Sequence, residues 1–100
     1  MPFPVEFHPE ARTDFYVAVD WYEGERLGLG MAFSTGVQLA LTRAAAIPLA
    51  GSPVGTELRR VFVPHFPYSV LYAVETTRLW VVAVAHFRRR PGYWRDRLTG

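Results

Sequence analysis

Arginine is the residue type that offers most chemistry in this sequence. All eleven basic residues are arginine, and there is no cysteine. A guanidinium binds phosphate or carboxylate through two parallel hydrogen bonds, whereas the lack of cysteine excludes disulfides, thiolate metal sites and cysteine nucleophiles. Arg88, Arg89 and Arg90 are consecutive and are not balanced by nearby acids. We expect this run to bind phosphate or an acidic protein surface, the alternative being a solvated charge run.

The same segment carries two aromatic residues. Residues 87–100 contain five arginines and one acid around Tyr93 and Trp94. We expect a turn at Pro91-Gly92, with the aromatic rings holding this tail against the body of the protein. The predicted target-binding residues are Arg88, Arg89, Arg90, Tyr93, Trp94 and Arg95.

Charge is distributed unevenly along the chain. Residues 1–30 hold six acids and two arginines, net −4, whereas residues 31–100 hold nine arginines and three acids, net +6. The basic part is therefore the expected contact surface for a partner.

The histidines do not form a metal site by their spacing. His8 precedes Pro9 and is expected to cap a helix, and His65 lies in a turn flanked by prolines. Neither completes a metal triad, and GLGMAF follows a helix rather than a strand, unlike a phosphate-binding loop. We therefore expect no metal, no cofactor and no small-molecule substrate.

Two helices and a strand are predicted in the first half. Phe3, Val5 and Phe7 alternate with polar residues or proline, which is typical of a short strand. A helix begins near Pro9, and a second one ends before Pro48, each with one apolar stripe. The short connection at residues 27–30 predicts an antiparallel helical hairpin, with Gly28 or Gly30 in a left-handed conformation. We expect Phe15, Val19, Phe33, Val37, Leu41, Val70 and Val81 in or beside one core.

The second half is strand-rich. Residues 48–55 contain two prolines and two glycines and are predicted to be a loop. Three strands follow at residues 58–63, 68–75 and 79–86, joined by short turns, and they form an antiparallel meander. Strict alternation in the last strand places His86 on one face with Trp80, Val82 and Val84. The last two strands are apolar on both faces, so the face away from the helices is either shallowly packed, curled on itself or kept for a partner.

Length and composition fit a single domain over residues 1–100, of α+β class. Half of the residues are hydrophobic, which is ample for a core. The first residues lack the features of a signal peptide, and the apolar run at residues 79–85 is far shorter than the roughly 20 residues of a membrane helix. We expect a cytoplasmic protein with no membrane role.

Short motifs in a fixed order suggest a family. FHPEAR stands near the start, WYE and GLG lie in the hairpin, LRR opens a strand, and FPY, AVAH and PGYW follow. In this order and spacing the sequence resembles the RelE/ParE toxins of bacterial toxin–antitoxin pairs. The resemblance implies a sheet backed by a helical hairpin and a toxin neutralised by an antitoxin encoded beside it.

Two activities are open under this resemblance. ParE-like members poison DNA gyrase, and RelE-like members cut messenger RNA on the ribosome. If the chain were a nuclease, Arg60, His86 and Tyr93 would be its catalytic residues. The nuclease members most similar in this region place tyrosine directly after the histidine, whereas Phe87 stands here. This departure favours a non-enzymatic, ParE-like toxin that binds gyrase.

Alternative roles are also open for the candidate residues. Arg60 could instead pair with Glu75 in the sheet, and His86 could be the hydrogen-bonded end of an apolar stripe. The predicted antitoxin-binding residues are Arg59, Arg60, Trp80 and Val82.

Overall fold

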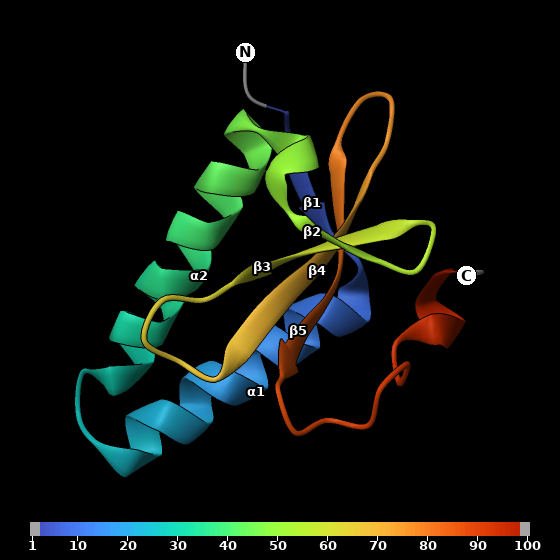
Figure 1. Cartoon of the computed structure of the whole chain (residues 1–100). Coiled ribbons are helices and arrows are strands. Elements are labelled where there is room, and N and C mark those ends of the chain that lie inside the picture. The colour runs from blue at the N-terminus through green and yellow to red at the C-terminus, as the bar shows by residue number, and fades with distance from the viewer. Residues whose placement is uncertain (1–2, 99–100) are drawn as a thin grey trace.

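The computed structural model describes residues 3–98 and has the predicted α+β fold (Figure 1). The elements are β1 (Val5–Phe7), α1 (Pro9–Glu25), α2 (Leu29–Ala46), the 3-10 turn η1 (Pro48–Ala50), β2 (Ser52–Val54), β3 (Leu58–Phe62), β4 (Tyr68–Val74), β5 (Leu79–His86) and the 3-10 turn η2 (Arg95–Leu98). The strands form one sheet in the order β1-β5-β4-β3-β2. β1 is parallel to β5, and the other neighbours are antiparallel, so the predicted meander is confirmed.

Local hydrogen bonds define the helical hairpin. The ring Nδ1 of His8 accepts the N–H of Glu10 at 3.0 Å, which is the expected cap of α1. Gly28 has φ +88°, a conformation that suits glycine, and it lets α2 begin almost at once. The carboxylate of Glu23 accepts the N–H groups of Gly28 and Gly30 at the open start of α2. No helix within residues 3–98 is long and apolar enough to cross a membrane.

The helices cover one face of the sheet and form the main core with it. Phe33, Val37, Val70 and Val81 are buried there. Phe15, Val19 and Leu41 pack against them, so the predicted core is confirmed. The Phe33 ring lies 4.8 Å from Tyr68 and 5.2 Å from both Tyr22 and Phe66, measured between ring centroids. Aromatic contacts thus connect both helices to the β3–β4 turn.

The prediction that residues 48–55 form a loop is wrong. They contain η1 and β2, and β2 extends the sheet at the edge of β3. A guanidinium nitrogen of Arg59 donates to the carbonyls of Leu49 and Gly51 at 2.9 and 2.7 Å, and the Tyr72 hydroxyl donates to the Pro48 carbonyl at 2.7 Å. These contacts come from distant residues, and Pro53 is tolerated because β2 is a short edge strand.

A β-bulge in β5 changes which face its side chains occupy. Leu71 is opposite Ala83, but Tyr72 is opposite Val81, so Val82 is an extra residue. Val81 and Val84 consequently both belong to the main core, while Val82, Ala83 and Ala85 lie on the opposite face. The predicted grouping of His86 and Val84 with Val82 is therefore wrong, because strict alternation fails at the bulge.

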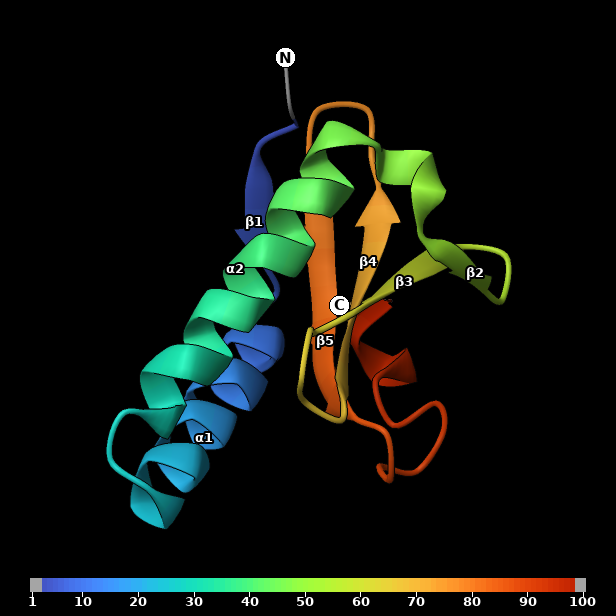
Figure 2. The same cartoon turned by 60° about the vertical axis from the view of Figure 1, so that its left-hand side comes forward.

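Residues 87–98, called the tail below, cover part of the second face of the sheet. Figure 2 shows the helices on one side of the sheet and the tail on the other. Tyr93, Trp94 and Leu98 pack on a buried cluster made of Leu58, Leu71, Val82, Ala83 and Ala85. The aromatic rings thus hold the tail as predicted, and residues 99 and 100 lie outside the described part of the chain.

Candidate binding groove

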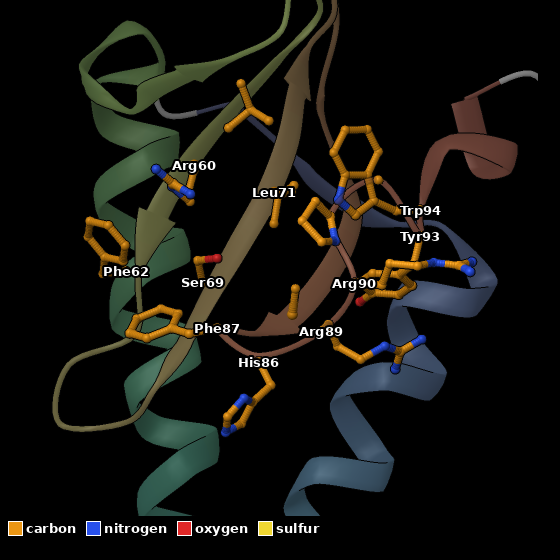
Figure 3. Close-up of a pocket in the computed structure, with 14 residues that line it drawn as sticks. Arg60, Phe62, Ser69, Leu71, His86, Phe87, Arg89, Arg90, Tyr93 and Trp94 are labelled. Atoms are coloured by element: carbon orange, nitrogen blue, oxygen red, sulfur yellow. The ribbon is translucent and has the colours of Figure 1, made fainter.

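A groove of about 360 Å³ lies between the sheet and the tail (Figure 3). Arg60, Phe62, Ser69 and Leu71 form its sheet side, and the tail contributes the opposite wall. The tail residues along it are Phe87, Arg89, Arg90, Pro91, Gly92, Tyr93 and Trp94. We call this feature the basic groove, because its lining includes three arginines and no acidic residue.

The arginines of the basic groove have no carboxylate partner within residues 3–98. Within residues 3–98, the arginines in ion pairs are Arg78 and Arg97. Glu75, the alternative partner of Arg60, forms its ion pair with Arg78 instead. Arg60 instead lies 5.3 Å from the centroid of the Phe62 ring. Unpaired guanidinium groups at one groove attract an anionic ligand.

Two exposed phenylalanines give the basic groove an apolar side. Phe62 is 54% exposed and Phe87 is 56% exposed, and their rings meet edge to face at 5.7 Å. This pair is not apparent from the sequence, because the two rings come from the ends of different strands. Alternation along β3 places Phe62 and Arg60 on one face, and this is the only part of the pair's position that the sequence indicates. The basic groove therefore suits a ligand with both acidic and apolar groups.

Asp14 of α1 connects the tail to the sheet. Its carboxylate accepts the Tyr93 hydroxyl at 3.1 Å, the backbone N–H of Val84 at 3.1 Å, and both terminal nitrogens of Arg97 at 2.7 and 3.2 Å. Arg97 also donates to the Val82 carbonyl at 3.0 Å. The side chains of Arg97 and Asp14 are only 8% and 10% exposed. Sequence reasoning missed this pair, since nothing local links residue 14 to residue 97.

This network changes the acidity of two tail groups. Burial, helped by the negative charge of Asp14, raises the pKa of the Tyr93 hydroxyl to about 12. Burial alone would lower the pKa of Arg97, but the hydrogen bond and charge of Asp14 outweigh it and raise that pKa. Tyr93 is therefore a neutral hydrogen-bond donor with its proton held toward Asp14.

His86 is at the rim of the basic groove, but its ring points away from Arg60 (Figure 3). The ring meets Tyr68 edge to face at 5.1 Å, on the side of the sheet that carries the helices. Its Nδ1 accepts the backbone N–H of Arg88 at 3.0 Å, which fixes the start of the tail. The structure thus brings Arg60, His86 and Tyr93 to one groove without directing their polar groups to a common point.

The other predicted residues have varied positions. Arg88 and Arg95 are exposed. Trp94 is half-buried on the second face, and Arg59 is bonded to the backbone near η1.

Like Arg59, the predicted antitoxin-binding residues Trp80 and Val82 lie outside the basic groove. Trp80 has Arg78 over its ring at 4.0 Å. Val82 is fully buried, so a partner reaches it only if the tail moves. Residues 3–98 contain no cluster of three or more potential metal ligands.

Comparison with solved structures agrees with this architecture. The chain is similar to a chain of the chromosomal ParDE toxin–antitoxin system from P. aeruginosa, with a TM-score of 0.75 over 84% of this chain and 95% of that one. The fold is RelE/ParE-like. Sequence identity with that chain is 12%, so the likeness concerns the RelE/ParE-like fold. Comparison with protein-family models and with curated proteins finds no match.

Proposed function

We propose that this chain is the toxin of a type II toxin–antitoxin pair, that it acts on DNA gyrase as a binding protein, and that a cognate antitoxin neutralises it. The fold similarity to a ParDE system supports the general class. The basic groove supports action by binding, because it offers unpaired guanidinium groups and exposed phenyl rings. Both kinds of group are typical of protein-binding surfaces.

The orientation of His86 is the observation that favours binding over RNA cleavage. Cleavage needs a base, an acid and a cation around one phosphate. The His86 ring points away from Arg60, and the Tyr93 hydroxyl is hydrogen-bonded to Asp14. Phe87 has no hydroxyl to donate. Arg60 could supply the cation for RNA cleavage, but His86, Tyr93 and Phe87 do not place an acid and a base beside it.

The arginine run should carry toxicity. We expect the triple change of Arg88, Arg89 and Arg90 to Ala to abolish growth arrest while the fold survives, because exposed arginines contribute little to stability and all three are exposed. A control that removes positive charge elsewhere is the double change of Arg26 and Arg43 to Ala, two exposed arginines of the helical hairpin. The measurement is gyrase-linked DNA breakage after brief expression. Equal breakage by the triple variant and the unmodified chain contradicts the assignment.

Messenger RNA cleavage is the alternative activity, and His86→Gln tests it. Glutamine keeps a hydrogen-bonding group but does not carry a proton near neutral pH. We expect His86→Gln to retain DNA breakage, and Phe87→Tyr to produce no RNA cleavage. Primer extension on ribosome-bound transcripts is the measurement. Codon-positioned cuts that disappear in His86→Gln, without DNA breaks, would replace gyrase by the ribosome as the target.

The antitoxin is proposed to place acidic and apolar groups in the basic groove. Arg60 is the predicted antitoxin-binding residue that lines it. Ordering of a partner segment there should give a large negative heat-capacity change in titration calorimetry. Co-expression with the neighbouring reading frame should restore growth, and less so with Arg60→Ala. Unchanged growth arrest with that partner contradicts this part of the proposal.

A further inference from the structure

Few backbone hydrogen bonds join the tail to the rest of the protein. Its backbone bonds are those of turns, such as Arg89 N–H to His86 carbonyl at 3.0 Å and Tyr93 N–H to Arg90 carbonyl at 3.2 Å. Apart from the bond to the adjoining His86, the one backbone bond from the tail to another part of the chain joins Phe87 N–H to the Pro67 carbonyl at 2.9 Å, among the residues described. Side chains must therefore fix the rest of the tail.

Asp14 provides the polar part of that fixation from outside the basic groove. It is absent from the groove lining. One oxygen of its carboxylate accepts hydrogen bonds from Tyr93 and Arg97 of the tail and also from the backbone of β5. β1 ends at Phe7, opposite Val81, so within the described part of the chain β5 has no strand neighbour on this side beyond Val81. Asp14 and Arg97 satisfy Val84 N–H and the Val82 carbonyl in place of a strand.

Tyr93 connects this network to the basic groove. The guanidinium of Arg89 lies 3.8 Å from the centroid of the Tyr93 ring, and that of Arg97 lies 5.0 Å from it. The ring is thus contacted by a groove arginine and by the arginine that binds Asp14. A cation over an aromatic face is attracted to a defined position. Fixing the Tyr93 hydroxyl therefore restricts where the Arg89 charge can lie.

We propose that Asp14 is a positioning residue for Arg89 and acts through Tyr93, so that the anion-binding geometry of the basic groove depends on a carboxylate outside it. The consequence for gyrase binding rests on the proposed function; the positioning of Arg89 does not. Arg60, on the opposite wall, contacts Phe62 and does not belong to this chain of contacts.

The first test observes Arg89 directly by NMR. Protons of the Arg89 side chain should be shifted upfield by the Tyr93 ring in the unmodified chain. The upfield shift should be lost in Asp14→Asn and reduced in Tyr93→Phe, which keeps the ring but removes its bond to Asp14. Tyr93→Phe makes the smaller change and provides the answer if Asp14→Asn does not fold. An Arg89 shift that is unaltered in both folded variants overturns the proposal.

The second test is a double-mutant cycle on binding to purified DNA gyrase. Asp14→Asn should weaken binding about tenfold, the loss typical of one charge-assisted hydrogen bond. The loss should vanish in an Arg89→Ala background and persist in an Arg60→Ala background, because only the former removes the positioned group. Equal losses in the two backgrounds contradict the proposal. If the unmodified chain does not bind gyrase, the proposed function fails, and the NMR test still decides whether Asp14 positions Arg89.

Discussion

The ion pair between Asp14 and Arg97 is a sensitive point at the scale of single residues. Breaking a buried pair leaves an uncompensated charge and costs about 3–5 kcal/mol. We expect Arg97→Met to lower the free energy of unfolding by that amount, and Arg78→Met by much less, since Arg78 pairs with exposed acids. Urea denaturation of both variants measures the difference. Similar losses from the two would contradict the expected cost of leaving Asp14 buried without its partner.

The raised pKa of Tyr93 makes the free energy of unfolding depend on pH in the alkaline range. Its pKa rises from 10.0 in the unfolded chain to about 12 in the fold. The unfolded state therefore loses this proton first, so the stabilisation is complete below pH 10 and falls as the pH rises toward 12. We expect unfolding curves between pH 10 and 12 to show a smaller decline in Tyr93→Phe. An identical decline in both proteins would contradict the raised pKa.

Among the elements, the helical hairpin depends on one carboxylate at its turn. Glu23 accepts backbone N–H groups at the start of α2, where a helix lacks internal partners. We expect Glu23→Ala to cost about 1–2 kcal/mol, as the loss of a helix cap does. Glu25→Ala, at an exposed position of the same helix, should change stability by less than about 0.5 kcal/mol. Thermal unfolding monitored by circular dichroism compares the two.

The accuracy of the sequence predictions also differs between elements. The helices and the meander follow from local periodicity, and their cores are as predicted. β2 was missed because Arg59 and Tyr72 hold its segment from elsewhere in the chain. The faces of β5 were misassigned because a bulge at Val82 leaves no signal in an unbroken apolar run.

The candidate site was only partly predictable for the same reason. Two of its arginines, Arg89 and Arg90, could be identified from the run at residues 88–90, and Arg60 from the resemblance to the family. The exposed pair of Phe62 and Phe87 and the contact from Asp14 to Arg97 depend on how distant segments pack.

For the molecule as a whole, the tail completes the packing of the second face of the sheet. Ending the chain after Arg88 would remove Tyr93, Trp94 and Leu98 from their buried partners. Each large apolar side chain contributes about 1.5–3 kcal/mol when fully buried, so we expect a loss of several kcal/mol and strong binding of an apolar dye. The triple change of Arg88, Arg89 and Arg90 to Ala serves as the control, because it keeps those rings. A truncated chain as stable as the control would show that the tail is dispensable.

The position of the tail also sets an order of events during translation. Residues 87–98 are synthesised after every strand of the sheet, and polypeptides emerge at roughly 5–20 residues per second with earlier segments folding first. Until residues 87–98 have packed on the sheet, the apolar surface around Leu71 and Val82 lacks the cover that Tyr93, Trp94 and Leu98 give it. A partner that meets the chain before the tail has packed therefore finds a different surface than one that meets it afterwards.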